Sequence, residues 1–173
     1  MQIGQLTFVP AVEAPELVAE PVRPHLADGL WVSEIDPGLA DTAEFCEHYD
    51  IGLNISANCV VVEARRAERV WYAACLVLAT TRADVNGVVR KHLGARKISF
   101  APMDTAVSLT GMEYGGITPV GLPADWPILV DENVVNKEHV IIGSGIRGSK
   151  LLVVTDLLAR LPTAEVLAIT KEQ

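Results

Sequence analysis

The sequence predicts a single α+β domain built on a curved sheet, mixed or mostly antiparallel, with flanking helices. A length of 173 residues suits one domain with a substantial core, and half of the residues are hydrophobic. Strand-like and helix-like segments follow one another, and two long apolar, β-branched stretches lie close together in the chain. No internal repeat or low-complexity region interrupts them.

The first forty residues (1–40) are rich in Pro, Glu and Ala and are expected to form a lead-in to the main domain, which spans 41–173. Within the lead-in, residues 13–20 predict a short helix. Residues 30–35, with the sequence LWVSEI, are typical of an edge strand.

The segments that follow predict one helix and one hairpin. Asp41 with Glu44 three residues later is a helix-start pattern, and it opens a helix over 41–49. Residues 58–64 and 70–79 are apolar and β-branched, so we expect them to pair as a hairpin.

Asp84 is the expected N-cap of a second helix, which Gly94 ends. A short strand over 97–100 and a helix over 103–110, with Gly111 at its end, come next. The remaining chain predicts strands at 127–130, 140–142 and 150–154, a helix that begins at Thr155–Asp156 and stops before Pro162, and a last strand at 164–169.

The composition excludes several classes of function. A net charge of −8 argues against a general nucleic-acid coat, because binding phosphates requires clustered Lys and Arg. Basic residues do gather locally, which suits contact with one end of a nucleic acid or, equally, a solvated face. These residues are Arg65, Arg66, Arg69, Arg90, Lys91, Arg96, Lys97, Arg147 and Lys150.

No segment indicates a membrane span or a signal peptide, and we expect a soluble, cytoplasmic protein. The longest apolar stretch, 70–79, is about half the length of a spanning helix. The three cysteines form no CxxC pair, and neither a metal site nor a cofactor is expected. Cys59 lies in an apolar strand, where a thiol usually behaves as a small hydrophobe rather than a nucleophile.

The segment Gly115-Gly116-Ile117-Thr118-Pro119 is the strongest candidate for a binding loop, and 143–148 (GSGIRG) is the next. Glycine allows positive φ and close approach of a ligand, whereas proline fixes its own φ. Such a loop can present N–H and C=O groups to a small substrate without any reactive side chain. Ordinary turns between strands are the alternative.

From about residue 41 to 161 the chain resembles the YbaK/ProX family of aminoacyl-tRNA deacylases, whose relatives include the editing insertion of bacterial prolyl-tRNA synthetase. The resemblance rests on several motifs in the same order as in that family. They are Asp84, Leu93-Gly94-Ala95-Arg96-Lys97, Thr110-Gly111, the loop 115–121 with the family's GxxxP pattern, Leu129-Val130-Asp131-Glu132, 143–151 and Asp156-Leu157-Leu158.

The resemblance implies trans-editing, which is hydrolysis of the ester between a wrong amino acid and the 3′ end of tRNA, and so a role in translation fidelity. The terminal ribose hydroxyl would assist, so few protein acids or bases are needed. Aminoacyl-tRNA is the implied partner, and homo-oligomerisation and association with an aminoacyl-tRNA synthetase are left open.

The residues that the resemblance assigns to the site fall into two groups. The catalytic group is Gly115, Gly116, Pro119 and Asn58, and the substrate-binding group is Ile117, Thr118, Asp131, Ser144, Gly145 and Arg147. Two of them have an ordinary structural alternative. Asp131 would serve as a turn residue after a strand, and Arg147 would form a surface ion pair.

One position departs from the family pattern. Members typically carry a lysine followed by a small hydroxyl residue where this chain has Asn58 and Cys59. An asparagine amide forms hydrogen bonds but carries no charge. Three outcomes are open: a changed substrate choice with activity retained, a basic group supplied from elsewhere such as Arg147, or loss of catalysis. The last outcome would leave a non-catalytic module that binds an aminoacyl or nucleotide end or a protein partner.

Overall fold

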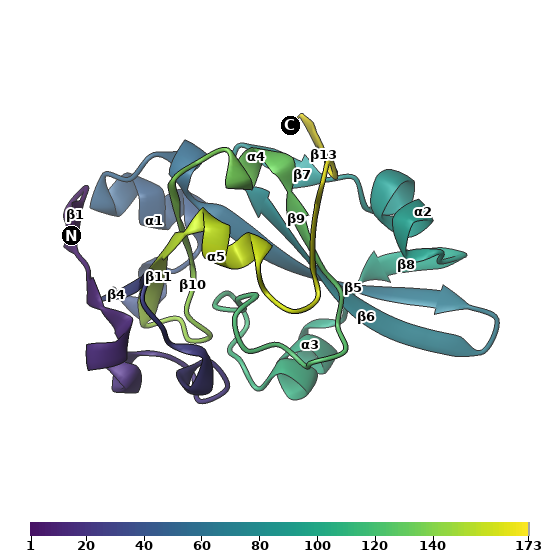
Figure 1. The fold of residues 1–173 in the computed structure, drawn as a ribbon, viewed down its shortest axis with the longest axis horizontal. Coiled ribbons are helices and arrows are strands. Elements are labelled where there is room, and N and C mark those ends of the chain that lie inside the picture. Colours follow the sequence, from purple (N-terminus) through teal and green to yellow (C-terminus); the bar gives the residue numbers. More distant parts are fainter. Residues whose placement is uncertain (173) are drawn as a thin grey trace.

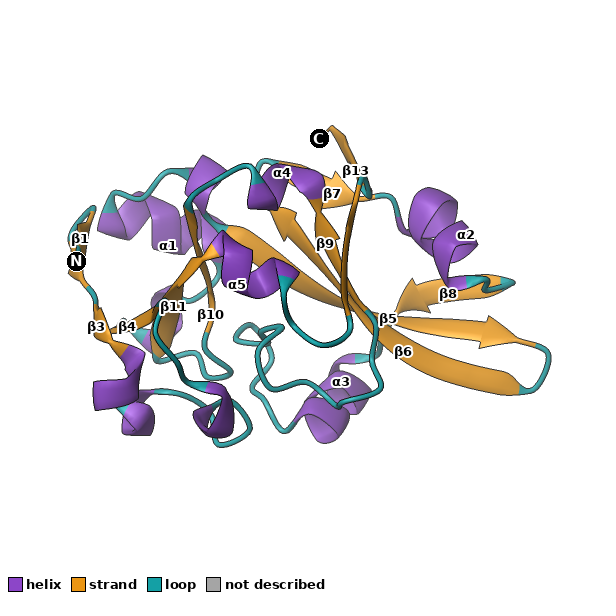
Figure 2. Ribbon diagram, viewed as in Figure 1, coloured by secondary structure: helices purple, strands orange, loops and turns teal. Residues whose placement is uncertain are grey.

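The computed structural model, which describes residues 1–172, contains two principal sheets that lie side by side (Figures 1 and 2). Five strands in the order β12-β9-β6-β5-β8 form a mixed sheet, and four in the order β10-β11-β4-β3 form an antiparallel sheet. The sheets meet at an isolated bridge between Ser56 and Ile141. The predicted α+β class is confirmed, and the expected single sheet is divided in two.

The five-stranded sheet is built around the predicted hairpin. β5 (Ala57–Arg66) and β6 (Arg69–Leu78) pair antiparallel in a register that places Asn58 opposite Val77. β8 (Lys97–Phe100) adds antiparallel to β5. β9 (Ile128–Asp131) and β12 (Ala164–Leu167) add in parallel on the side of β6, which makes the sheet mixed.

The four-stranded sheet has β11 (Ser149–Val154) between β10 (His139–Gly143) and β4 (Leu30–Glu34). The strand expected over residues 30–35 forms as β4, but it is not an edge strand, because β3 (Val9–Pro10) pairs with it on the side away from β11. That pairing covers only Trp31 and Val32, and it comes from a segment that carries no strand signal of its own.

In the described part of the chain, five α-helices flank the sheets: α1 (Thr42–Tyr49), α2 (Arg90–Leu93), α3 (Met103–Thr110), α4 (Glu132–Val135) and α5 (Thr155–Ala159). Short strands complete the described chain: β1 (Gln2–Ile3), β2 (Leu6–Thr7), β7 (Thr81–Ala83) and β13 (Thr170–Glu172). Asp84 caps as predicted by accepting from the Val88 N–H, but the helix begins with a π turn over Val85–Val89 before α2.

The first forty residues pack against the main body of the molecule. Ala11, Val18 and Val22 are buried in the same hydrophobic cluster as Leu151 and Val153 of β11. The predicted helix over 13–20 is wrong. Two 3₁₀ turns, Ala11–Glu13 and Pro15–Leu17, occupy the region, because Pro15 has no N–H with which to continue a helix from the first turn.

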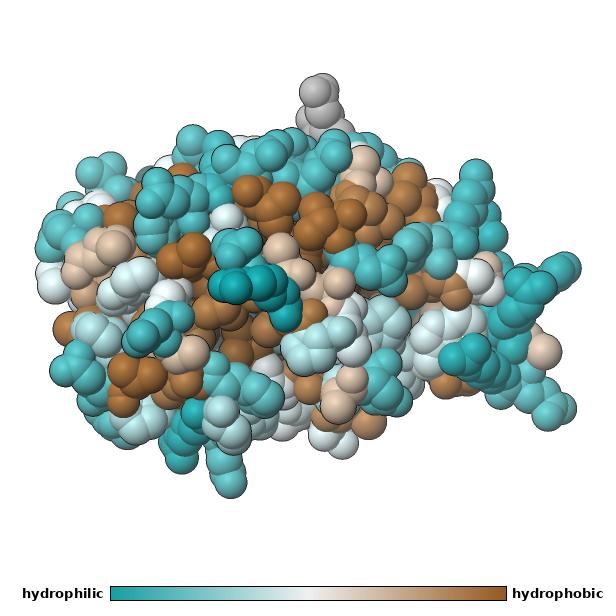
Figure 3. Space-filling model, viewed as in Figure 1, coloured by the Kyte–Doolittle hydropathy of each residue, from teal (hydrophilic) through white to brown (hydrophobic). Residues whose placement is uncertain are grey.

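Hydrophobic clusters fill both faces of the two sheets. The largest lies between the sheets, a second joins α1 to the outer face of the four-stranded sheet, and two smaller ones lie under α2 and α3. On the face drawn in Figure 3 the projecting tip of the β5–β6 hairpin is hydrophilic. Within residues 1–172 no helix is both long and apolar enough to cross a membrane.

Candidate active site

A pocket of about 390 Å³ opens where the two sheets meet. It is bounded by the first half of β5, the start of α1, the loop after α3 and facing residues of β10 and β11. Its lining residues are Ala40, Asp41, Thr42, Ala57, Asn58, Cys59, Val60, Val61, Phe100, Ala101, Ala106, Tyr114, Gly115, Ile117, Gly143 and Lys150. The volume lies in the range of small-molecule sites.

The glycine–proline loop contributes to this pocket through Gly115 and Ile117. Gly115 is exposed and adopts φ +88°, a conformation that favours glycine. No hydrogen-bond acceptor within residues 1–172 pairs with the backbone N–H of Gly115 or Ile117. Neither donor is therefore used inside the described chain, and both belong to residues that line the pocket.

The backbone groups of Gly116 are used inside the protein. Its N–H donates to the Glu113 carbonyl at 2.9 Å, and its carbonyl accepts from the Gly145 N–H at 2.7 Å. Thr118 and Pro119 are buried behind the loop and do not line the pocket. The Thr118 hydroxyl has no hydrogen-bond partner in the described chain.

The second glycine segment packs backbone against backbone with the first. A Cβ on Gly143 would lie 2.5 Å from the Gly116 carbonyl oxygen, and one on Gly145 would collide with the Ala19 Cβ. Ser144 is fully buried, and its hydroxyl contacts the Ser149 hydroxyl at 2.6 Å and the Ile146 carbonyl at 3.1 Å. Gly145 thus supports the loop 115–119 through its bond to Gly116, whereas the Ser144 hydroxyl stabilises its own segment.

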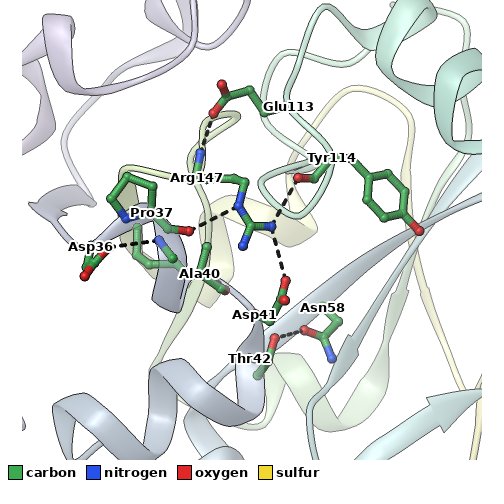
Figure 4. A network of polar contacts seen from close by, with 11 residues as sticks. Asp36, Pro37, Ala40, Asp41, Thr42, Asn58, Glu113, Tyr114 and Arg147 are labelled. Carbon is green, nitrogen blue, oxygen red and sulfur yellow. Dashed lines mark hydrogen bonds and ion pairs between the residues drawn. The ribbon is translucent and has the colours of Figure 1, made fainter.

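Arg147 ties together three segments at the rim of the pocket (Figure 4). Its Nη1 lies 3.2 Å from an Asp41 carboxylate oxygen and 3.5 Å from the Tyr114 carbonyl, and its Nε donates to the Pro37 carbonyl at 3.2 Å. Its backbone N–H donates to the Glu113 carboxylate at 2.7 Å. The guanidinium therefore fixes the position of α1 relative to the loop that carries Gly115.

Asn58 lines the pocket and is the second residue of β5. Its Oδ1 accepts from the Thr42 hydroxyl at 2.5 Å, which joins β5 to the start of α1 (Figure 4). Its neighbour Cys59 also lines the pocket, but burial, with the nearby Cys75, raises the pKa of the Cys59 thiol far above its usual value. The thiol therefore remains protonated and is no nucleophile.

Lys150 is a pocket residue that the sequence reasoning did not assign to the site. It is 8% exposed, and its Nζ donates to the Ala40 carbonyl at 2.9 Å and lies 5.0 Å from the centre of the Phe45 ring. Burial lowers the pKa of Lys150 from 10.5 to about 8; Arg147 also lowers it, whereas Cys46 and Asp41 raise it. A lysine inside an otherwise apolar strand was the signal available in the sequence.

Asp131 lies away from the pocket and is completely buried. Its Oδ2 accepts from the Asn133 N–H at 3.1 Å and so caps α4, while its Oδ1 accepts from the Ile169 N–H at 3.0 Å. Of the ten assigned residues, the structure brings Gly115, Ile117 and Asn58 into the pocket, with Arg147 at its rim.

The fold and sequence match known proteins over most of the chain. A family model described as aminoacyl-tRNA editing domain matches residues 36–161. A crystal structure of a candidate trans-editing enzyme for prolyl-tRNA synthetase is similar at 19% identity and a TM-score of 0.73, covering 95% of this chain and 99% of that one.

Two further solved structures have a similar fold. A scaffold protein used for epitope backbone grafting by computational design matches at 20% identity and a TM-score of 0.71, over 82% of this chain and 87% of its own. The hypothetical protein APE2540 matches at 20% identity and a TM-score of 0.68, over 76% and 85%. At these identities the likeness establishes a shared fold.

Proposed function

The chain belongs to the aminoacyl-tRNA editing domain family, and from this premise we propose that it hydrolyses the ester of mischarged aminoacyl-tRNA as a separate trans-editing enzyme. The observation that carries the proposal is the pocket at the junction of the two sheets. It lies within the matched segment and is lined by Gly115 and Ile117, whose N–H groups are unpartnered in the described chain.

In the proposed reaction a water molecule adds to the ester carbonyl carbon. The carbonyl oxygen becomes an oxyanion, which the N–H groups of Gly115 and Ile117 stabilise, because fixed donors need no reorganisation as the charge develops. The bond from the carbonyl carbon to the ribose oxygen then breaks. The proton lost by the water passes through the neighbouring ribose hydroxyl to the leaving oxygen.

The remaining assigned residues support this geometry. Gly116 and Gly145 hold the loop in place through their hydrogen bond, Ser144 stabilises the segment that carries Gly145, and Arg147 fixes the rim. Asn58 contributes a neutral amide whose Oδ1 is already bonded to Thr42. We therefore propose that Asn58 positions the substrate through its NH₂ group.

The decisive assay follows release of free amino acid from a complete panel of charged and mischarged tRNAs. We expect turnover above the buffer rate for at least one mischarged member. Saturable binding of aminoacyl-tRNA with no turnover on any member would replace this proposal with a non-catalytic binding module, the alternative that the neutral Asn58 suggests.

Gly115→Ala tests whether the loop is the site, and Gly94→Ala is its matched control. Both glycines have positive φ, +88° and +69°, so both substitutions place an alanine in a backbone conformation that L residues rarely adopt. A Cβ at Gly115 would collide with the Arg147 guanidinium, whereas none at Gly94 meets an atom within 4 Å. We expect at least a tenfold loss of kcat/KM in Gly115→Ala alone. Equal activity in the two variants would remove the loop from the mechanism.

A further inference from the structure

Lys150 occupies an unusual place for a charged residue, the central strand of the four-stranded sheet. Its cross-strand neighbours are Gly143 on β10 and Ser33 on β4. Residues directly opposite in an antiparallel sheet share a face, so these small side chains leave room beside the lysine stem. The stem therefore extends over the sheet face to the pocket that Gly143 and Lys150 both line.

The ammonium is buried without a counter-ion. Of its three N–H donors, one bonds to the Ala40 carbonyl, and no acceptor within residues 1–172 takes the other two. The carboxylate at the pocket, Asp41, is paired with Arg147, and Lys150 forms no ion pair in the described part of the chain. Burying a charge is costly unless it is paired or hydrogen-bonded, so an ammonium at the wall of a pocket favours an electronegative group bound there.

We propose that the Lys150 ammonium binds an oxygen of the aminoacyl-ribose ester at the end of tRNA and supplies the positive charge of the pocket from β11, while position 58 on β5 carries a neutral amide. This inference rests on the proposed function and adds the residue that recognises the substrate. Arg147 suits that role less well, because Nε and Nη1 of its guanidinium are already bonded to Pro37, Asp41 and Tyr114 and it does not line the pocket.

The test moves the charge within the pocket. Lys150→Met keeps an unbranched side chain that is one atom shorter, removes the charge and suits a buried site. Lys91→Met on the exposed surface of α2 is its control. We expect Lys150→Met to lower kcat/KM at least a hundredfold with an undiminished melting temperature. Adding Asn58→Lys returns an ammonium to the same pocket from β5, and we expect at least a tenfold recovery.

A pH profile separates contact with substrate from a structural role. The groups facing Lys150 are Asp41 and Cys46 from α1 and Arg147 from the loop after β10; its strand neighbours Ser33 and Gly143 do not titrate. We expect kcat/KM of the wild type, corrected for spontaneous hydrolysis, to fall above about pH 8 as one proton is lost. The doubly substituted variant, whose lysine stands at the more exposed position 58, should keep its activity to higher pH.

Binding of a non-hydrolysable amide analogue of aminoacyl-adenosine distinguishes failure of the Lys150 inference from failure of the proposed function. If the wild type hydrolyses tRNA esters and Lys150→Met binds and hydrolyses equally well, this inference falls and the proposed function stands. A wild type that neither binds the analogue nor releases amino acid overturns both. If Lys150→Met does not fold, the pH dependence of the wild type is the test. A kcat/KM that does not fall above about pH 8 overturns the inference by itself.

Discussion

Replacing Lys150 by methionine should stabilise the protein at pH 7. The difference in the free energy of unfolding between the two proteins should change as the pH is raised. The fall in the pKa of Lys150 from 10.5 to about 8 corresponds to about 3 kcal/mol, since one pKa unit is about 1.36 kcal/mol. At pH 7 the ammonium is charged in both folded and unfolded chains, so the folded state bears the whole desolvation cost. Methionine of similar size removes that cost.

Two losses offset part of the gain. The Ala40 carbonyl loses a hydrogen bond worth about 1 kcal/mol, and the contact with the Phe45 ring is worth about 0.5–1 kcal/mol. The net expectation is that Lys150→Met is more stable by about 1–2 kcal/mol at pH 7. For a chain of this length that raises the melting temperature by about 2–4 °C per kcal/mol.

The direction of the pH dependence follows from proton binding. Between about pH 8 and 10.5 the folded protein holds fewer protons on Lys150 than the unfolded chain, so unfolding takes up a proton and stability rises with pH. The wild type should therefore gain about 3 kcal/mol relative to Lys150→Met over that range. Urea unfolding of both proteins at pH 7, 8, 9 and 10 measures the difference, because the other titrating groups cancel. A difference that stays constant over this range would refute the buried, partner-poor ammonium.

Three further predictions concern residues around the pocket. Asp131→Ala should lower the free energy of unfolding, measured in urea, by about 2–4 kcal/mol, because it removes the cap of α4 and leaves the buried Ile169 N–H unpaired. The kcat/KM of the folded variant should stay within about threefold of the wild-type value. A much larger loss of activity would indicate that Asp131 contacts the substrate. Arg147→Ala should reduce kcat/KM about tenfold in steady-state assays. The free energy of unfolding should change by less than about 1 kcal/mol, since the ion pair with Asp41 is partly exposed. Unchanged activity would mean that catalysis does not depend on the contacts of Arg147 at the rim of the pocket. Gly143→Ala should destabilise the protein by about 1–3 kcal/mol in thermal unfolding, because the methyl group would press on the Gly116 carbonyl, and an unaltered melting temperature would contradict that packing.

Much of the fold was predictable because it depends on local patterns. The hairpin of β5 and β6, the strand β8 and the helix α3 lie within a few residues of the expected ranges. Gly94 and Gly111 end helices in left-handed conformations as expected. α4 was missed, since four residues are too few for a helical period.

The errors fall where distant segments decide the local structure. The expected helix 13–20 is replaced by 3₁₀ turns that bury Ala11 against the sheet, and β4 owes its neighbour β3 to a pairing across some twenty residues of chain. Pairings of this kind are chosen by packing, not by the propensity of either segment.

For the site, the sequence by itself determined which loop could present backbone groups, because only glycine and proline impose that conformation locally. Tertiary structure alone decided which of those groups are used inside the protein. The N–H and the carbonyl of Gly116 are bonded to Glu113 and Gly145, whereas the N–H groups of Gly115 and Ile117, two residues that line the pocket, have no partner within residues 1–172. It also brought Lys150, more than ninety positions later in the chain, into the pocket that Asn58 lines. The physical reason is that a hydrogen bond or a buried charge depends on every neighbour in space, and those neighbours come from segments far apart in the chain.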